Sequence, residues 1–373
     1  MRTKYQFVKD EIKSKILQGF IQPHQKVGSE NELIKKYEVS RHTIRKAIDD
    51  LVNEGWIYKK QGAGTFCADR SVNKLVKEGR GKNIAVISTY FSNYIFPSIF
   101  RGTEGYLSEQ GYHMTFYSTN NNLEQEQRCL ENVLSQKFDG LIVEPTKSAL
   151  PNPNINYYLN LERIGIPYVM INAFYDELEP IHIVMDDVEG GRMQTKHLIE
   201  QGHEKILGLF KSDDTQGTNR MKGFIKAHRE SGVPLRPQYI ITYTTETENT
   251  ATVEALYEKL QDSNDRPTAI VCYNDQLAIL LLDVLRDMKL SIPEDISIIG
   301  FDDSFLSVAS EVKLTTIRHP QEEMGIMAGK TIQQLIEKKN NPSMVEDVQS
   351  VVYEPELIVR HSTSKIGMKE SNR

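Results

Sequence analysis

The sequence predicts an α/β protein with a small helical head at the N-terminus and a larger domain of alternating strands and helices. Two patterns support this division. Residues 5–54 show three helical stretches followed by a glycine-rich hairpin, whereas strands and helices alternate from Asn83 onward. The net charge also changes sign, from +5 over residues 1–70 and +3 over 71–83 to −14 over the rest. A basic head on an acidic body is typical of a nucleic-acid binder with a separate sensing domain.

Length and composition place the chain among globular proteins of two or three domains. It has 373 residues, of which 39% are hydrophobic and 26% charged, and a domain commonly takes about 150 residues. The apolar runs are too short to cross a membrane, and the charged N-terminus lacks a signal-peptide core. Cys67, Cys129 and Cys272 lie far apart, outside any metal-ligand spacing. We therefore expect free thiols, no cofactor or metal, and a cytoplasmic protein.

The head is predicted to contain three helices. Apolar residues at helical spacing mark the first helix at residues 5–18. The residues 29–32 (SENE) form a capping box that opens a second helix ending near Tyr37. Ser40 is a suitable N-cap for a third helix, over residues 41–54. Two short helices joined by a tight turn are a helix-turn-helix.

The second helix of that motif exposes polar and basic side chains near its N-terminus, which is the end that enters the major groove in this architecture. These side chains are Arg41, His42, Thr43, Arg45 and Lys46. Arginine can bind guanine O6 and N7 with two hydrogen bonds, and His or Thr can add contacts to base or phosphate. The alternative is a basic surface helix with no binding partner.

A hairpin follows the three helices. The sequence predicts strands at residues 56–60 and 65–68 around a glycine-rich turn, which permits positive φ and a close approach to another molecule. Such a tip suits a wing that lies against phosphate or in a minor groove, although the glycines could serve the turn alone. The candidate contacts of this wing are Lys59, Gln61, Gly62, Gly64 and Thr65.

The head resembles the gluconate-repressor (GntR) type of winged helix. It carries the S-E-x-E-L, V-S-R-x-T-x-R-x-A and G-x-G-T-F elements in that order within about 40 residues. The resemblance implies that Arg41, Thr43, Arg45 and residues 62–65 contact a double-stranded operator. It also implies a homodimer on a two-fold symmetric site. His42 replaces a residue that is commonly small in this family, so it is expected to tune base preference.

Residues 71–83 (SVNKLVKEGRGKN) are polar and basic, and we interpret them as a linker between domains. A short helix over residues 72–76 is one possibility within it. Its basic side chains either touch DNA phosphate or are simply solvated, and the second interpretation is favoured. These side chains are Lys74, Lys77, Arg80 and Lys82.

The body, residues 84–362, alternates strands with helices, and residues 363–373 are expected to form a tail. The predicted strands are 84–89, 114–119, 140–144, 168–172, 181–185, 206–210, 269–273 and 296–300. The predicted helices are 97–110, 123–136, 155–164, 188–201, 217–231, 249–263, 275–288 and 321–339. This pattern predicts mostly parallel, doubly wound sheets, whose ligands bind beyond the carboxyl ends of the strands.

No catalytic signature is found in the body. It lacks a phosphate-binding G-x-x-x-x-G-K-[ST], a dinucleotide-binding G-x-G-x-x-G after a strand and a nucleophile elbow. The pairs Asp186-Asp187 and Asp302-Asp303 could act as acid and base or hold a metal, but no histidine stands at a metal-type offset from either. Carboxylates after strands are also common acceptors for sugar hydroxyls. An enzyme is therefore disfavoured.

The body resembles the effector domain of lactose and galactose repressors, itself similar to periplasmic sugar-binding proteins. The matching stretches include MDDVEGGRMQTKHLIEQGHEKI, NRMKGFIKA and TAIVCYNDQLAILLLDVLRDMKLSIPEDISIIGFDD. The resemblance implies a two-lobed α/β domain with a small effector between the lobes. A GntR-type head on this body resembles the arabinose-repressor family of Gram-positive bacteria, whose effector is L-arabinose. Under that resemblance the protein represses sugar-utilisation genes and is released from its operator by the sugar.

Two groups of residues are expected to line the effector pocket. The resemblance implies Arg220, Asn274, Asp302, Asp186 and His319. Position after predicted strands adds Tyr94 and Phe96, which could stack on a sugar, and Glu144 and Lys147, which suit a small polar pentose. Each has a structural alternative, such as a helix cap for Asp186 or Asp302, a surface ion pair for Arg220 and a core position for Phe96.

Three other functions compete with that of a sugar-responsive repressor. A stand-alone sugar carrier would not need the head, and an enzyme would need a catalytic set. A regulator for another sugar or a purine remains an alternative, because stereochemistry cannot be derived from the residues. A purine pocket would want a further aromatic sandwich, and the Glu144/Lys147 pair argues against it. The helix bearing Ile99, Phe100 and Leu107 and the helix at 275–288 are candidate dimer faces.

Overall fold

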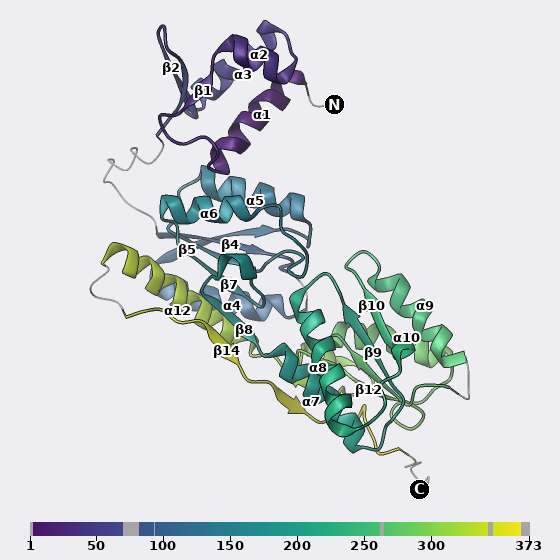
Figure 1. The fold of residues 1–373 in the computed structure, drawn as a ribbon. Coiled ribbons are helices and arrows are strands. Elements are labelled where there is room, and N and C mark those ends of the chain that lie inside the picture. Colours follow the sequence, from purple (N-terminus) through teal and green to yellow (C-terminus); the bar gives the residue numbers. More distant parts are fainter. Residues whose placement is uncertain (1–2, 70–81, 93, 262–264, 342–345, 367–373) are drawn as a thin grey trace.

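The protein consists of a head and two lobes that follow one another along its length (Figure 1). A computed structural model describes residues 3–69, 82–92, 94–261, 265–341 and 346–366. The head contains the N-terminal helices and hairpin, and each lobe has a parallel sheet covered by helices. The predicted fold class is confirmed.

The head has the three helices and the hairpin that the sequence predicts. The helices are α1 (Lys4–Leu17), α2 (Glu30–Tyr37) and α3 (Arg41–Asn53), and the hairpin strands are β2 (Ile57–Lys60) and β3 (Gly64–Cys67). Ser29 and Glu32 form the expected capping box of α2. Ser40 caps α3 by accepting a hydrogen bond from the backbone N–H of Thr43. These local signals fix where the two helices of the motif begin.

One strand of the head was not predicted. β1 (Lys26–Gly28) pairs antiparallel with β3, so the hairpin becomes a three-stranded sheet in the order β1-β3-β2. Three residues are too few to show an alternating pattern, and the strand forms because β3 offers it a free edge.

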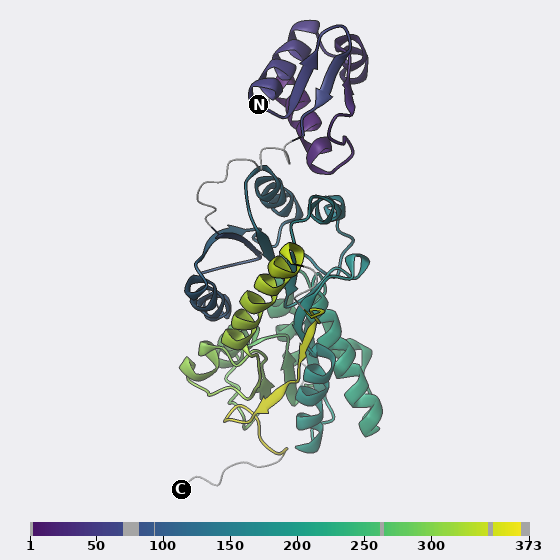
Figure 2. The same ribbon diagram turned by 90° about the vertical axis from the view of Figure 1, so that its left-hand side faces the viewer.

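The first lobe has a six-stranded parallel sheet in the order β14-β8-β7-β6-β4-β5. Its strands are β4 (Lys82–Ser88), β5 (Tyr112–Ser118), β6 (Gly140–Val143), β7 (Tyr168–Ile171), β8 (His182–Met185) and β14 (Val351–Tyr353). The helices α4 (Phe96–Glu109) and α12 (Gln321–Asn340) pack together on one face. The helices α5 (Leu123–Ser135) and α6 (Ile155–Ile164) cover the other face, toward the head (Figure 2).

The second lobe has a four-stranded parallel sheet in the order β10-β9-β11-β12. Its strands are β9 (Ile206–Lys211), β10 (Ile240–Tyr243), β11 (Ala269–Cys272) and β12 (Ser297–Ile299). Its long helices are α7 (Asp187–Glu200), α8 (Thr215–Ser231), α9 (Glu248–Gln261) and α10 (Asp275–Asp287), and a short α11 (Phe305–Ala309) packs near α10. The predicted parallel βα order is therefore confirmed in both lobes. The sequence patterns missed β10 and α11, and also β14 of the first lobe.

The chain passes between the lobes three times. It leaves the first lobe between β8 and α7, returns through β13 (Thr316–Arg318) to α12, and leaves again from β14 through β15 (Glu356–Ile358). β13 and β15 pair antiparallel. These strands were not predicted, since each is three residues long and gains its pairing only from the returning chain.

Two predicted domain boundaries are wrong. Lys82 and Asn83 belong to β4 and not to the linker, because they pair with Tyr112 and His113 of β5. The Asn83 N–H also donates to the Asp139 carboxylate. The Lys82 ammonium donates to the carbonyl of Gln110, at the edge of the first lobe. Lys74, Lys77, Arg80 and the possible helix at 72–76 lie outside the described residues.

At the other end, the contacts of the second lobe continue past residue 362. The backbone N–H of Ser364 donates to Ser297, and that of Ile366 donates to the carbonyl of Gln201. The part of the predicted tail that the structure describes is therefore packed on the second lobe. Within the described ranges, no helix combines the length and apolarity needed to span a bilayer.

Candidate ligand cavity and DNA-contacting surface

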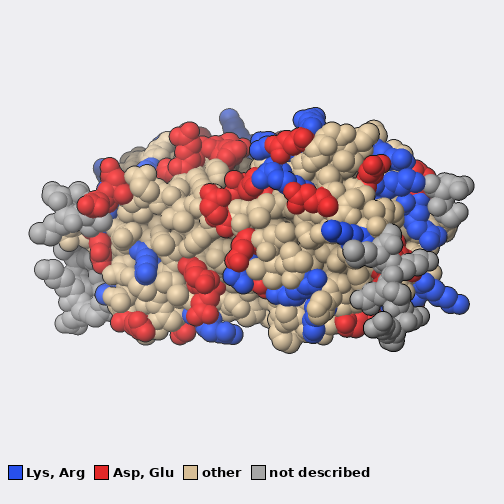
Figure 3. Space-filling view, turned by 90° about the horizontal axis from the view of Figure 1, so that it is seen from below, with Lys and Arg blue, Asp and Glu red and all other residues tan. Residues whose placement is uncertain are grey.

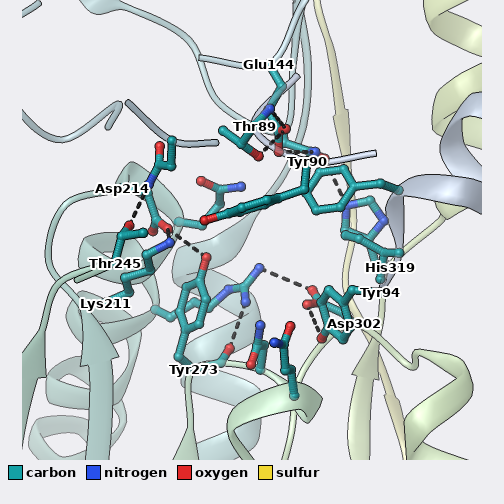
Figure 4. Close-up of a pocket in the computed structure, with 18 of the residues that line it drawn as sticks. Thr89, Tyr90, Tyr94, Glu144, Lys211, Asp214, Thr245, Tyr273, Asp302 and His319 are labelled. Carbon is teal, nitrogen blue, oxygen red and sulfur yellow. Dashed lines mark hydrogen bonds and ion pairs between the residues drawn. The ribbon is translucent and has the colours of Figure 1, made fainter. Parts of the chain in front are cut away.

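A cavity of about 310 Å³ lies between the two lobes. Its walls are built from residues that follow the strands of both sheets, including Thr89, Glu144 and Asn172 in the first lobe and Tyr273 and Asn274 in the second. Figure 4 shows Thr89 and Glu144 on one side of the cavity and Tyr273 on the other. This is the position at which parallel α/β sheets bind ligands.

Arg220, from α8, is the central cation of the second-lobe wall. Its Nε donates to Asp187 (2.8 Å), its Nη1 to the Tyr273 carbonyl (2.7 Å) and its Nη2 to Asp302 (3.4 Å). The guanidinium also lies 3.5 Å from the ring centroid of Phe301. A guanidinium has five N–H groups, so these contacts hold it in one orientation while two N–H groups remain for a ligand.

Charge balance around Arg220 is tight. Burial alone would lower the pKa of its guanidinium, but the carboxylates of Asp187 and Asp302 outweigh burial and raise it. Burial raises the pKa of Asp187 to about 6, although Arg220 opposes that shift. Arg220 is therefore permanently charged and is needed to neutralise two buried carboxylates.

Asp302 is held in a strained backbone conformation at the edge of the cavity. The backbone angle φ is 96° at Asp302 and 44° at Asp303, and residues other than glycine rarely adopt such positive values. The first lobe contacts Asp302 directly, because the Tyr94 hydroxyl donates to its Oδ2 at 2.5 Å. Strain of this kind persists where surrounding contacts fix it, and it is enriched at ligand sites.

The first-lobe wall is a chain of hydrogen bonds that begins at Glu144. The carboxylate accepts hydrogen bonds from the Ser88 hydroxyl, from the Thr89 N–H and hydroxyl, and from the Asn172 amide. Asn172 therefore turns its Oδ1 toward Nε2 of His319, 3.2 Å away. Burial lowers the pKa of His319 to about 4, so the ring is neutral near pH 7. Because Oδ1 of Asn172 can only accept, this contact requires the tautomer with its proton on Nε2.

Aromatic rings supply the apolar surfaces of the cavity. Tyr90, Tyr94 and Phe96 come from the first lobe and Tyr273 from the second. The Tyr90 ring crosses the cavity in Figure 4, and its centroid is 5.9 Å from that of Phe96. Polar groups beside aromatic faces are the combination that a sugar requires, with hydroxyls on one side and C–H groups on the other.

The cavity wall carries more negative than positive side chains. The carboxylates are Glu144, Asp187, Asp214, Glu248 and Asp302, and the cations are Lys211 and Arg220. Lys211 is itself paired, with its ammonium 3.4 Å from Asp214. An acidic wall with paired cations favours a neutral polyhydroxyl ligand over an anion.

Seven of the nine side chains predicted for the effector pocket line this cavity. They are Tyr94, Phe96, Glu144, Arg220, Asn274, Asp302 and His319. Asn274 has a second role, because its Oδ1 caps α10 by accepting the N–H of Leu277. Only its amide N–H groups are left for a ligand.

Asp186 and Lys147 do not line the cavity. Asp186 caps α7 by accepting the N–H of Glu189, whereas its neighbour Asp187 faces the cavity and binds Arg220. The prediction of Asp186 is therefore wrong and its neighbour Asp187 is the lining residue, because both carboxylates stand at the start of the same helix. This correction follows from the direction in which each side chain leaves the first turn of α7.

Lys147 joins the lobes outside the cavity. Its ammonium pairs with Glu246 and lies 3.9 Å from Asp213, both in the second lobe. Beside it, the Asn121 amide donates to the Thr245 hydroxyl at 2.6 Å. We call Lys147, Asn121, Asp213, Thr245 and Glu246 the interlobe latch. The pairing with Glu246 explains why a lysine that follows a strand fails to reach the ligand site.

Several lining residues were not predicted. They are Thr89, Tyr90, Asn121, Asn172, Asp187, Lys211, Asp214, Gln216, Thr245, Glu248, Asn249, Tyr273 and Gln276, with Ile95, Pro145 and Met185 as apolar members. Many follow a strand directly, as Thr89, Asn172 and Tyr273 do. Reading every polar residue at a strand's carboxyl end, and not only the charged ones, would have found those three.

The predicted DNA-contacting side chains of α3 lie on the surface of the head. Arg41, His42, Arg45 and Lys46 are exposed, and Thr43 is half-buried. Arg45 donates from Nε to both oxygens of Glu30 at 3.1 Å, so its guanidinium is held beside α2. An operator would have to compete with that carboxylate for Arg45.

The wing tip is exposed at Gln61 and Gly62, and Lys59 is exposed next to Asp49. Gly62 has φ of 72° and Gly64 of 114°, so both need glycine. The predicted side-chain contact of Thr65 with DNA is corrected, because this side chain is only 5% exposed. The side chain packs inside the three-stranded sheet opposite Gly28 and is not exposed for a contact with DNA.

The opposite end of the molecule can be compared with the head over its described residues. Among the residues coloured in Figure 3, acidic and basic side chains are interspersed and form no broad basic field. A DNA-binding face needs such a field. The exposed basic side chains of α3 and of the wing make the head suited to an operator.

Comparison with known proteins supports both halves of this architecture. Residues 4–67 match the family described as bacterial regulatory proteins, gntR family, and residues 195–363 match a periplasmic binding protein-like domain. Among solved structures, the transcription regulator CcpA of Lactococcus lactis aligns with a TM-score of 0.66 and 25% identity, over 76% of this chain and 100% of that one. A LacI family regulator from Enterococcus faecium, solved with bound ribose, shares the body fold with a TM-score of 0.63 at 24% identity, over 76% and 100% of the two chains.

Relatives that span the whole chain are transcription regulators, and this chain is one as well. An arabinose metabolism transcriptional repressor of Halalkalibacterium halodurans is 64% identical over 98% of each chain. Another with the same name, from Geobacillus stearothermophilus, is 48% identical over 97% of this chain and 98% of its own. The chain thus belongs to the family of arabinose metabolism transcriptional repressors, which join a gntR-type DNA-binding head to a periplasmic binding protein-like body.

Proposed function

We propose that L-arabinose binds in the cavity between the lobes and releases the repressor from the operator of arabinose-utilisation genes. The observation that carries this proposal is the fixed Arg220 guanidinium, which keeps two N–H groups free in a cavity with polar walls from both lobes. Vicinal hydroxyls are suited to such a rigid pair of donors. The effector needs no cofactor or metal in this scheme, and the protein acts where its DNA lies, in the cytoplasm.

Release follows from the way the ligand would join the lobes. Glu144, Asn172 and His319 stand on the first-lobe side, and Arg220 and Asn274 on the second. A sugar held by both sides favours the arrangement seen here, with the latch and the Tyr94–Asp302 bond in place. A ligand shifts such an equilibrium only by its differential affinity, typically about 1–3 kcal/mol of coupling.

The proposal includes a homodimer. Two-fold operators require two heads at a fixed separation, so a change in lobe angle within paired bodies would misplace the heads. The predicted dimer face at Ile99, Phe100 and Leu107 is wrong, since these side chains are buried in the first lobe. The second predicted face, on α10, continues into α11, where Phe305 is 79% and Val308 39% exposed.

We infer that a second copy covers this apolar surface of α11. Phe305→Asp should convert a dimer in sedimentation into a monomer, because a buried charge opposes association. Phe116→Asp, on the exposed side of β5, is the matched control and should leave the dimer intact. A Phe305→Asp protein that remains dimeric would remove α11 from the interface.

The mode of DNA binding is also part of the proposal. The N-terminal half of α3 enters the major groove, with Arg41, His42 and Arg45 toward the bases, and the wing tip approaches the backbone. The exposure of these side chains supports this placement.

The competing function is transcription regulation with a purine as effector. Purine repressors from Aliivibrio fischeri are about 29% identical over 80% of this chain, and four aromatic rings line the cavity. Lys147 no longer argues against a purine, since it lies outside the cavity. The acidic wall and the far higher identity to arabinose repressors favour the sugar.

Thermal unfolding of the full-length protein with a ligand panel separates these functions. The panel holds L-arabinose, D-xylose, D-ribose, D-galactose, hypoxanthine and guanine. A true effector stabilises the folded state by about 2.7 kcal/mol at a concentration of 100 Kd, whereas a non-ligand does nothing. We expect L-arabinose to raise Tm at the lowest concentration. A purine that does so instead would replace the sugar as effector.

A further inference from the structure

The DNA-binding head rests on the first lobe through the C-terminal end of α1. Figures 1 and 2 show this end of α1 against α6 from two directions. The Asn160 amide donates to the Leu17 carbonyl at 2.5 Å. The Ser14 hydroxyl lies 2.9 Å from the Tyr157 hydroxyl, and the Gln18 amide donates to the same hydroxyl at 3.1 Å. Contact is thus made by specific polar groups of both parts.

The lobe holds these groups in place by its own hydrogen bonds. Arg163 donates to Oδ1 of Asn160 from Nε (2.9 Å) and Nη2 (2.7 Å), which turns the Asn160 amide N–H groups toward the head. The Tyr157 hydroxyl donates to Glu131 at 2.9 Å, so its oxygen is left to accept from the head. The docking side chains are therefore oriented before the head arrives.

The head presents a matching acceptor. Leu17 is the last residue of α1, and the carbonyls in the last turn of a helix have no N–H donor within the helix. Asn160 supplies the missing donor, so a residue of the body caps a helix of the head. Asn160 is 6% and Tyr157 2% exposed. Separation of the head would leave the Asn160 amide and the Leu17 carbonyl to be satisfied by water.

Docking leaves the DNA-contacting surface open. The contacts come from Ser14 to Gly19, whereas Arg41, His42 and Arg45 are exposed at the start of α3. Among the described residues, these three side chains make no hydrogen bond to either lobe. A docked head can therefore still present α3 to an operator.

We propose that the head and the first lobe bind DNA as one rigid body, locked by the Asn160–Leu17 and Tyr157–Ser14 contacts. If the effector binds as proposed above, the second lobe is then the part that moves. The motion reaches the heads through the paired bodies, and the linker does not have to transmit it.

A disulfide tests the docking directly. A Cβ built on Gly19 would lie 3.7 Å from Cβ of Asn160, within the range of about 3.5–4.5 Å that disulfides span. Gly19→Cys/Asn160→Cys should therefore form an intramolecular disulfide under mild oxidation without DNA. The native Cys67, Cys129 and Cys272 are buried. The matched pair Gly19→Cys/Leu159→Cys uses the exposed neighbour on α6 and should not cross-link.

Operator binding by the oxidised Gly19→Cys/Asn160→Cys chain tests whether the docked head can bind DNA. We expect the oxidised and reduced forms to bind the operator equally well. A disulfide that forms but abolishes operator binding would overturn the rigid-body claim, because the docked head would then be inactive. Equal cross-linking of the Leu159 pair, or none of the Asn160 pair, would overturn the docking itself.

A second variant avoids the strain of a cysteine at Gly19, whose φ is 76°. Asn160→Ala should increase hydrogen–deuterium exchange of the last turn of α1 in the full-length protein, and Leu159→Ala should not. Unchanged exchange in Asn160→Ala would contradict the docking even if the double variant folds poorly. None of these measurements uses a sugar, so a wrong effector assignment would leave their outcome unaffected.

Discussion

The Tyr94 hydroxyl of the first lobe lies 2.5 Å from Oδ2 of Asp302 in the second. The same hydroxyl accepts the backbone N–H of Asp275 at 3.2 Å and donates toward the Phe301 carbonyl at 3.1 Å. Burial and the neighbouring Asp302 carboxylate raise the pKa of Tyr94 well above its ordinary value, so it remains a donor. One side chain thus ties the cavity wall of the first lobe to the strained loop that carries Asp302.

Tyr94→Phe removes this tie, together with the hydrogen bonds that the hydroxyl makes to Asp275 and Phe301, and keeps the aromatic ring. A hydrogen bond to a charged group is worth about 1.5–3 kcal/mol, so the bridged arrangement is destabilised by that amount. The L-arabinose concentration for half-release of operator should rise about tenfold or more. Fluorescence anisotropy of labelled operator gives this concentration. Tyr106→Phe, which loses a bond to Gln333 within the first lobe, is the control. Equal release by both variants would contradict the tie.

Lys147→Met weakens the interlobe latch without removing a side chain that lines the cavity. The pair with Glu246 is partly exposed, since the Glu246 side chain is 61% accessible, and such pairs contribute at most about 1 kcal/mol. Half-release should therefore need about two- to fivefold more sugar, with sugar-free operator binding unchanged. Anisotropy of labelled operator measures half-release, and isothermal titration with L-arabinose measures sugar binding. A complete loss of sugar binding would show that Lys147 is itself a ligand contact.

Arg45 and Lys59 should differ in how they affect DNA binding. Arg45→Ala should cost about 1–3 kcal/mol and relax base preference if its contact to guanine is bidentate. Lys59→Ala should weaken all sequences alike and reduce the slope of log K against log salt by about one. Anisotropy over a salt series, on operator and on scrambled DNA, separates the two. Unaltered operator affinity in Arg45→Ala would remove α3 from the groove.

His319 makes stability depend on pH. Its pKa is lowered to about 4 by burial, whereas an unfolded histidine titrates near 6.5. As the pH falls from about 6.5 to 4, the unfolded chain takes up a proton that the folded chain does not, so stability falls, by up to about 3 kcal/mol. Burial raises the pKa of Asp187 to about 6 and of Asp275 to about 8, which acts in the opposite direction.

Urea unfolding of His319→Gln against the unmodified protein isolates the histidine contribution, since both carboxyl groups are present in each. We expect the difference in free energy of unfolding between the two proteins to change in favour of His319→Gln as the pH falls from 7 to 4. His113→Gln, at an exposed position on β5, should show no such change. Parallel pH curves for His319→Gln and the unmodified protein would contradict a neutral buried ring.

Local signals were sufficient to predict most of the fold. The Ser29–Glu32 capping box and the Ser40 N-cap give the starts of α2 and α3 because capping is settled by a few neighbouring residues. The parallel βα order follows from runs of apolar residues. β1 and β13 could not be predicted in this way, since each has three residues and forms only beside a strand distant in sequence.

The same distinction explains the site. Arg220 and Asp302 were found through family resemblance, but their mutual contact depends on how α8 and the loop after β12 pack. Asp186 and Asp187 cannot be distinguished by sequence. They are adjacent at the start of α7, and the orientation of that helix decides which side chain faces the cavity. Lys147 and Thr65 stand at positions that sequence favours for ligands, yet tertiary contacts turn one to Glu246 and the other into a sheet.

The most direct test of the central claim is operator binding titrated with sugars, in the unmodified protein and in Arg220→Lys. Arg220→Ala would leave two buried carboxylates without a counter-charge and endanger folding, whereas lysine keeps the charge and loses the planar pair of donors. We expect L-arabinose to release the unmodified protein at a lower concentration than D-xylose, D-ribose or D-galactose, and Arg220→Lys to bind operator normally without release. Release of the unmodified protein by another sugar at much lower concentration, or normal release of Arg220→Lys, would contradict the account.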